Sequence, residues 1–261
     1  MPTFARYWPR RVEAAEPLAA ALMDHHRTGR ARRVQAMRAD GVAFEIDTAE
    51  YFTLSGTLAS LDRAALDRCH GRVLDVGAGA GRHALALEAR GLEVTAIDVS
   101  PICTALCRER GVTDARTLDV MELDAVAALG RFDTILFGMQ TIGVAGGVRP
   151  LERLLTALRQ RVLARGGEIL ADSSALREPW EGDREDDSPE RGEIVLSLRY
   201  RGWMGEPFAW LYLAEPDLRA VAERAGFEME TLGRVASGEY LACLRAAAPT
   251  TSDAPGERAG T

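Results

Sequence analysis

Three glycines at alternate positions, Gly77, Gly79 and Gly81, form the most informative stretch of the chain. A backbone without Cβ atoms can turn tightly and approach a ligand closely. An apolar, β-branched run precedes the glycines, and a helix-like run follows them. The first turn of such a helix presents unpaired backbone N–H groups. The loop therefore predicts a binding site for a nucleotide-like ligand.

Two acids accompany this loop. Asp75 lies directly before the glycines, and Asp98 ends the next apolar run. An acid about 20 residues after such a loop accepts hydrogen bonds from ribose hydroxyls. A dinucleotide fingerprint needs a further glycine at position 82, where this chain has Arg82. The spacing therefore argues against NAD or NADP as the ligand.

Strand-like and helix-like runs alternate around the loop, which predicts βαβ units and a mainly parallel, doubly wound α/β sheet. The expected strands are residues 72–76, 93–97, 132–137, 167–171, 193–200, 208–213, 229–232 and 240–244, the last two antiparallel. The expected helices are residues 83–90, 101–110, 151–163 and 216–225.

The chain before the loop predicts a separate folded segment. A helix is expected over residues 17–26, a hairpin around Asp40-Gly41, and another helix over residues 50–68. We expect three parts: an N-terminal helix and hairpin cap (1–69), the ligand-binding domain (70–245) and a disordered tail (246–261). Residues 177–191, which are charged and contain two prolines, are expected to form a mobile loop.

From residue 73 to residue 81 the chain resembles the first motif of the class I S-adenosylmethionine (SAM)-dependent methyltransferases, an acid followed by G-x-G-x-G. Residues 96–101, 118–120, 132–137 and 166–170 are similar to later motifs, so the resemblance covers roughly residues 70–245. It implies a seven-stranded sheet with a reversed last strand, SAM as cofactor, and methyl transfer by in-line displacement. The cofactor-binding residues that it implies are Asp75, Gly77, Ala78, Gly79, Gly81, Asp98, Val99, Asp119 and Val120.

Methyl transfer from a sulfonium needs positioning more than acid–base help, so the sequence assigns no catalytic residue. Several side chains are nevertheless candidates, although each is more often a packing or surface residue: His25, His26, Tyr51, Asp172, Ser173, Ser174, Tyr200 and Tyr212. Arg82 is expected either to pair with an acid or with a ligand carboxylate, or to be solvated. His83 is expected to be a packing residue. Relatives often carry asparagine where Gln140 stands, which puts that residue's role in doubt.

Aromatic residues gather late in the chain: Trp180, Tyr200, Trp203, Phe208, Trp210 and Tyr212. The last three alternate and would share one face of a strand. That face is expected either to pack on the core, the slightly favoured reading, or to form a wall of an apolar substrate pocket.

Composition limits the partners of this 261-residue chain. The formal net charge is −7, which argues against nucleic acid. All 32 basic residues are arginine, which excludes lysine-based chemistry. The four scattered cysteines predict no metal site and a reducing, cytoplasmic location. No run is apolar enough for a membrane span or a signal peptide.

The favoured interpretation is a methyltransferase that acts on a small molecule. The acceptor atom and the oligomeric state are not determined by the sequence, and protein or peptide substrates are left open. Two alternatives stand beside it: a SAM-binding protein without transferase activity, and an NAD(P)-dependent oxidoreductase.

Overall fold

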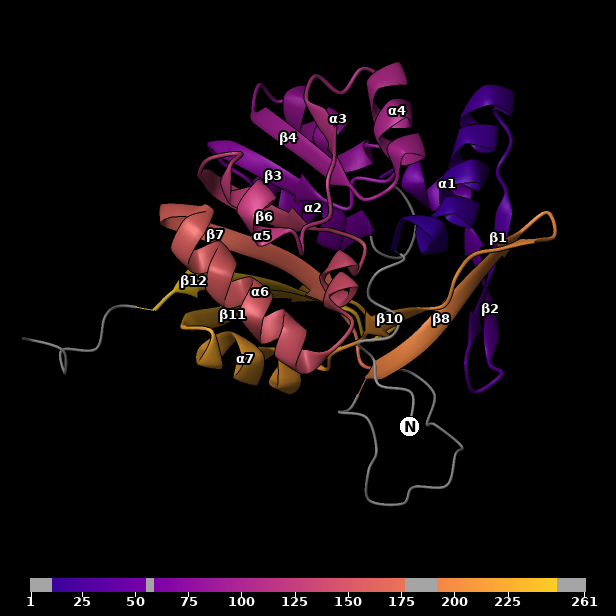
Figure 1. The fold of residues 1–261 in the computed structure, drawn as a ribbon. Coiled ribbons are helices and arrows are strands. Elements are labelled where there is room, and N and C mark those ends of the chain that lie inside the picture. Colours follow the sequence, from indigo (N-terminus) through magenta and orange to yellow (C-terminus); the bar gives the residue numbers. More distant parts are fainter. Residues whose placement is uncertain (1–10, 55–58, 177–191, 248–261) are drawn as a thin grey trace, which may run out of the picture.

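The computed structural model describes residues 11–54, 59–176 and 192–247. Within them lie two β-sheets with helices packed around them (Figure 1). The predicted loop over residues 177–191 and the predicted tail, apart from Ala246 and Ala247, lie outside the described residues.

The larger sheet has seven strands in the order β11-β12-β7-β6-β3-β4-β5. Five strands run parallel, whereas β12 is antiparallel to both β7 and β11. The predicted mainly parallel sheet with a reversed last strand is therefore confirmed. Its strands are β3 (Arg72–Val76), β4 (Glu93–Asp98), β5 (Ala115–Thr117), β6 (Phe132–Phe137), β7 (Leu163–Ser173), β11 (Phe227–Arg234) and β12 (Tyr240–Ala246).

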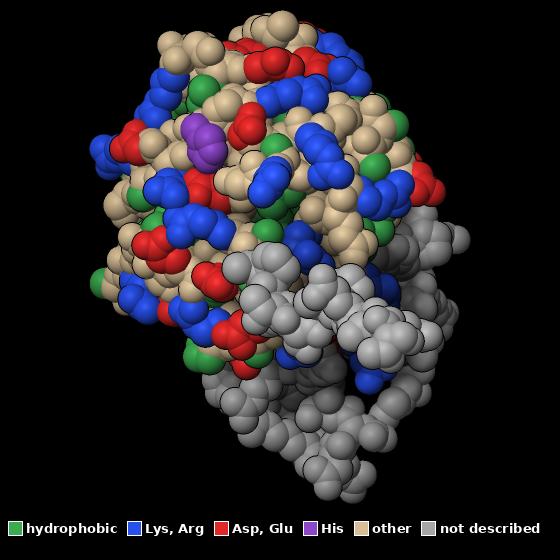
Figure 2. All heavy atoms as spheres, turned by 90° about the vertical axis from the view of Figure 1, so that its left-hand side faces the viewer, with side chains coloured by type: hydrophobic (Ala, Val, Ile, Leu, Met, Phe, Trp, Pro, Cys, Tyr) green, Lys and Arg blue, Asp and Glu red, His purple; other side chains and the backbone are tan. Residues whose placement is uncertain are grey.

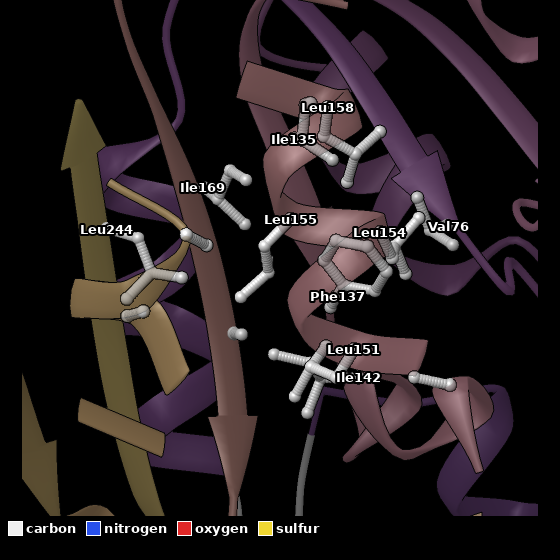
Figure 3. Packing of buried hydrophobic residues seen from close by; sticks show 14 of the residues in the cluster. Val76, Ile135, Phe137, Ile142, Leu151, Leu154, Leu155, Leu158, Ile169 and Leu244 are labelled. Atoms are coloured by element: carbon white, nitrogen blue, oxygen red, sulfur yellow. The ribbon is translucent and has the colours of Figure 1, made fainter. Parts of the chain in front are cut away.

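Helices cover both faces of this sheet, so the doubly wound arrangement is confirmed as well. One face carries α5 (Leu123–Ala127), α6 (Val148–Arg161) and α7 (Glu215–Arg224). The other carries α2 (Ala59–Arg68), α3 (Arg82–Glu88) and α4 (Pro101–Glu109). The helix α6 illustrates why these helices pack on the sheet. Its four buried leucines recur at helical spacing and contact β-branched and aromatic side chains of the sheet (Figure 3).

The smaller sheet is wholly antiparallel, in the order β10-β8-β1-β2, with β9 paired to β8. Its strands are β1 (Arg33–Arg38), β2 (Ala43–Asp47), β8 (Glu193–Tyr200), β9 (Trp203–Met204) and β10 (Phe208–Leu211). The hairpin predicted at Asp40-Gly41 is confirmed as β1–β2, with Gly41 at a φ of +91°. The pairing of β1 with β8 was not predicted, because it joins segments about 160 residues apart.

The first two predicted helices need correction. The helix α1 (Arg11–Thr28) begins before Pro17, which lies inside it. Proline removes one backbone donor, so the carbonyl of Glu13 has no intrahelical partner. Gly205 lies close to that carbonyl: a Cβ there would be 3.1 Å from Glu13 O. Of the helix expected over residues 50–68, the second half is present as α2. Residues 50–54 contain the end of a 3₁₀ turn, η2 (Thr48–Tyr51), and no α-helix, and residues 55–58 lie outside the described residues.

No helix in the described parts of the chain is long and apolar enough to cross a membrane. On the face drawn in Figure 2, arginine and acidic side chains are interspersed over the described residues. That surface has no large area of a single sign of charge.

Candidate functional site

A cavity lies where the parallel strands end, at the carboxyl ends of β3, β4 and β6. Its volume is about 410 Å³, which is in the range of small-molecule sites. The chain order reverses between β3 and β6, and ligands of doubly wound sheets bind at such a point. The opposite wall of this cavity is built from α1, η2, β2, β8 and β10.

The glycine loop forms the floor of the cavity. Gly77 and Gly79 have φ values of +70° and +56°, which favour glycine. A Cβ at Gly77 would lie 2.4 Å from Thr141 Cγ2, and one at Gly79 would lie 3.2 Å from the ring of Tyr51. Neither position has room for a side chain, and the absence of Cβ atoms lets Thr141 and Tyr51 pack directly against the loop.

Asp98 ties the loop to the end of β4. Its Oδ2 accepts a hydrogen bond from the Gly79 N–H at 2.9 Å, and its Oδ1 accepts one from the Ser100 N–H at 2.9 Å. Burial raises the pKa of this carboxyl. Asp98 borders the cavity, and each oxygen keeps a lone pair that a ligand hydroxyl can use.

Seven of the nine predicted cofactor residues border the cavity: Gly77, Ala78, Gly79, Asp98, Val99, Asp119 and Val120. Asp75 and Gly81 lie outside its lining. Gly81 begins α3, and a Cβ there would meet Val112 at 2.9 Å, so this glycine serves helix packing. Asp75 is buried behind the loop, and its Oδ2 has no hydrogen-bond partner among the described residues.

Asp119 meets a residue that the sequence analysis missed. Arg11, in the first turn of α1, donates from Nη1 to Asp119 Oδ1 at 3.1 Å and from Nη2 to the Val144 carbonyl at 2.6 Å. Burial lowers the pKa of Arg11, against the effect of Asp119. No local signal marks Arg11, because its partner lies 108 residues away.

Arg82 pairs with an acid, one of the alternatives left open by the sequence. Its Nη2 lies 2.7 Å from both carboxylate oxygens of Asp62, and its Nη1 donates to the carbonyls of Glu50 and Thr53. His83 Nε2 lies 2.9 Å from Asp62 Oδ1. Although burial acts to raise it, contacts with His83 and Arg82 lower the pKa of Asp62. The Arg82 guanidinium is thus paired within the protein at both Nη atoms, and the residue also borders the cavity.

A strained turn follows β6. Met139 and Gln140 have φ values of +56° and +60°. This left-handed backbone conformation costs conformational energy for residues other than glycine. Asp172, at the end of β7, accepts a hydrogen bond from the Gln140 N–H at 2.8 Å. Burial raises the pKa of Asp172 to about 7. Gln140 borders the cavity, so the turn held by Asp172 forms part of its wall.

The aromatic face of β10 turns toward the cavity. Phe208, Trp210 and Tyr212 border it, as does Ala209, whereas Leu211 is buried in the core cluster that contains the α6 leucines. The Phe208 and Trp210 rings meet edge to face, with centroids 6.0 Å apart. The aromatic face therefore forms part of the pocket wall, and Phe208 also packs against the core cluster of α1, β1 and β8.

Tyr51 also borders the cavity, and burial raises its pKa above the usual range. The other candidate side chains do not border it. Tyr200 donates to Asp24 at 2.7 Å, His25 contacts Thr48, and His26 pairs with Glu109. Trp203 is exposed, and Trp180 lies outside the described residues. Ser173 and Ser174 are buried beside β7.

In the part of the chain that the structure describes, no three potential metal ligands lie together. The four cysteines are buried and free. Cys103 borders the cavity, and burial raises the pKa of its thiol well above the ordinary value.

Comparison with known proteins adds an independent line of evidence. Residues 73–167 match a family model described as a methyltransferase domain. No curated protein matches the chain. A SAM-dependent methyltransferase from Bacteroides fragilis, solved with S-adenosyl-L-homocysteine, is 35% identical; the match covers 91% of this chain and 97% of that one, with a TM-score of 0.78.

More distant structures share the fold. The CcbJ methyltransferase from Streptomyces caelestis is 20% identical, with 76% of this chain and 91% of that one covered and a TM-score of 0.56. The sugar N-methyltransferase KedS8 from Streptoalloteichus is 18% identical, with 74% and 88% covered and a TM-score of 0.51. The glycine cradle, the acid at the end of β4 and the Bacteroides relative together identify the cofactor as S-adenosylmethionine. The chain belongs to the SAM-dependent methyltransferases.

Proposed function

We propose that the protein transfers the methyl group of SAM to a small-molecule acceptor with an apolar face. The observation that carries this proposal is the aromatic face of β10, which borders the same cavity as Gly79 and Asp98. A related fold serves a sugar N-methyltransferase, so a small acceptor is compatible with it.

Within this proposal, the seven cavity-lining residues of the predicted set bind the cofactor. Asp98 holds the ribose hydroxyls, and Asp119 and Val120 lie at the adenine. The glycine loop passes beneath the methionine portion. Asp75 and Gly81 then act indirectly, since they shape the loop from behind rather than touch the ligand.

SAM, when bound, supplies a methyl group that is already activated by its positive sulfur. The task of the chain is then to orient the acceptor and exclude water. Phe208, Trp210 and Tyr212 provide an apolar wall for the acceptor, and Tyr51 closes the space above Gly79. His83 is held by Asp62, so we assign it no proton transfer from the acceptor.

The proposal includes the division of the chain. Residues 1–69 form a helix and hairpin cap, residues 70–245 the SAM-binding domain, and residues 246–261 a tail. The cap covers the cavity through α1, η2 and β2. The strands β8 and β10 complete this cover, because β8 pairs with β1.

The acceptor is first sought by incubating the protein with methyl-labelled SAM and a metabolite extract, followed by mass spectrometry. With the acceptor in hand, Trp210→Ala is expected to raise its KM or lower kcat, because the variant removes part of the pocket wall, while SAM affinity stays near wild type.

Trp203→Ala is the matched control, since that tryptophan is 47% exposed and outside the cavity. If both variants have wild-type kinetics and Trp210→Ala only lowers thermal stability, the aromatic face is packing and the acceptor lies elsewhere.

A further inference from the structure

Three buried carboxylates lie close to one another near the cavity floor. Asp62, Asp75 and Asp172 are 6%, 1% and 6% exposed. They come from α2, β3 and β7, and His83 interacts electrostatically with all three. None of the three is a cavity-lining residue, so the cofactor does not touch them directly.

Positive charge in this cluster does not balance the acids. Arg82 is paired with Asp62 and with two backbone carbonyls, and its Nε has no hydrogen-bond partner among the described residues. No salt bridge joins Asp75 or Asp172 to a cation among the described residues. Burial raises the pKa of both carboxyls. Such buried acids favour a cation placed nearby, because desolvation makes an unbalanced charge costly.

The carboxylates Asp62 and Asp172 contact residues that border the cavity. Asp172 Oδ2 accepts from the backbone N–H of Gln140, a residue that borders the cavity. His83, the partner of Asp62, also borders it and lies against Gly138, where a Cβ would be 2.4 Å from the imidazole. Thr141 of the same turn faces Gly77. The carboxylates therefore lie one residue behind the part of the cavity wall that the glycine loop and the β6 turn form.

The cofactor before methyl transfer (SAM) and the cofactor product after it differ by one positive charge. SAM carries a sulfonium, whereas S-adenosylhomocysteine (SAH) carries a neutral thioether, with the rest of the molecule unchanged. We propose that Asp172, supported by Asp62 and Asp75, makes the site prefer SAM over SAH electrostatically and so limits inhibition by the product. This inference rests on the proposed placement of the methionine portion at the glycine loop.

The size of the preference follows from Coulomb's law. One unit charge about 12 Å from another, at an effective dielectric constant of about 20, changes affinity by on the order of tenfold. The neutral thioether of SAH, at the same place, gains no attraction from the Asp172 carboxylate. A change in SAH affinity would therefore report a change in the shape of the β6 turn that Asp172 holds, so SAH serves as the internal control.

Protonation removes the preference. A raised pKa of about 7 means that Asp172 is charged above that pH and neutral below it. The groups that face it are Asp62 from α2, His83 from α3 and Tyr240 from β12, whose pKa is raised above the usual range so that it stays neutral. SAM should therefore lose affinity relative to SAH as the pH falls through 7.

The test measures dissociation constants of SAM and SAH by calorimetry for the wild type and Asp172→Asn. Asparagine keeps an oxygen that can accept from the Gln140 N–H and removes only the charge. At about pH 8 we expect the variant to bind SAM about tenfold more weakly and SAH within about twofold of wild type. Sinefungin, which carries an amine in place of the sulfonium methyl, should weaken as SAM does, because it retains a cation.

The control variant is Asp124→Asn, a surface acid whose side chain is 96% exposed, and it should leave both affinities unchanged. Equal weakening of SAM and SAH in Asp172→Asn would show a structural role and overturn the inference. An unchanged SAM-to-SAH ratio would overturn it as well.

The wild type alone provides a second measurement if the variant fails to fold. Its SAM-to-SAH affinity ratio should fall between about pH 8 and about pH 6, and a constant ratio contradicts the inference. No acceptor is present in either experiment. Failure of the proposed acceptor site would therefore leave these binding results untouched, and the two failures can be distinguished.

Discussion

At the scale of single residues, Asp98 has two tasks. It is the proposed ribose ligand, and it also accepts hydrogen bonds from the Gly79 and Ser100 N–H groups. The sequence suggested only the first task, because the loop and the strand end meet through tertiary contact. A substitution here therefore acts on the ligand and on the loop together.

We expect Asp98→Ala to weaken SAM binding by about 1–3 kcal/mol, because buried donors and ligand hydroxyls lose their acceptor. The loss should come with reduced stability, since the Gly79 N–H is left unpaired. Asp98→Asn should lose less, because it keeps one acceptor oxygen. Calorimetry with SAM and urea unfolding measure the two effects. A folded Asp98→Ala protein with wild-type SAM affinity would exclude Asp98 as a cofactor ligand.

At the scale of elements, the Arg82–Asp62 pair joins α3 to α2. The carbonyls of Glu50 and Thr53 join both helices to η2 and to the segment after it. Both side chains are nearly buried. Since α3 begins directly after the glycine loop, this junction fixes the helix that the loop leads into. A cation at a helix N-terminus is unfavourable on its own, and Asp62 offsets it.

Arg82→Ala is expected to lower the free energy of unfolding by about 3–5 kcal/mol, because it leaves a buried carboxylate without its main partner. Arg90→Ala breaks the exposed pair with Asp67 and should cost less than about 1 kcal/mol. Chemical denaturation of the two variants gives the comparison. Equal, small losses would mean that the Arg82 pair is solvated in solution.

At the scale of the whole molecule, α1 bridges the two sheets. On one side Ala19 and Leu22 pack with Cys103 and Leu106 of α4. On the other side Asp24 accepts from Tyr200 of the smaller sheet. A deletion of residues 1–48, made to test whether α1 closes the cavity, would also remove β1, the partner of β8. Such a deletion would damage the smaller sheet and would not isolate the effect of α1.

Ligand binding should therefore be visible in α1 without any truncation. We expect SAM to slow amide hydrogen exchange in α1, because Arg11 joins this helix to Asp119 beside the proposed adenine position. The helix α7, which packs on β11 and α6 away from the cavity, serves as the internal control. Equal change, or none, in the two helices would contradict a closing role for α1.

The sequence by itself determined the parts whose signals are local. The strand, glycine loop, helix and Asp98 lie within about 30 residues, as a βαβ unit does. Their periods and glycines predict the fold and a nucleotide-like ligand, and the family resemblance of the same residues implies SAM. Asp40-Gly41 predicted its hairpin for the same reason. Tertiary structure alone decided the pairing of β1 with β8, the partners of Arg11 and Arg82, and the direction of the aromatic face. Alternation shows that a strand has two faces, but both faces of β10 are apolar, so only the surrounding packing decides which one borders the cavity.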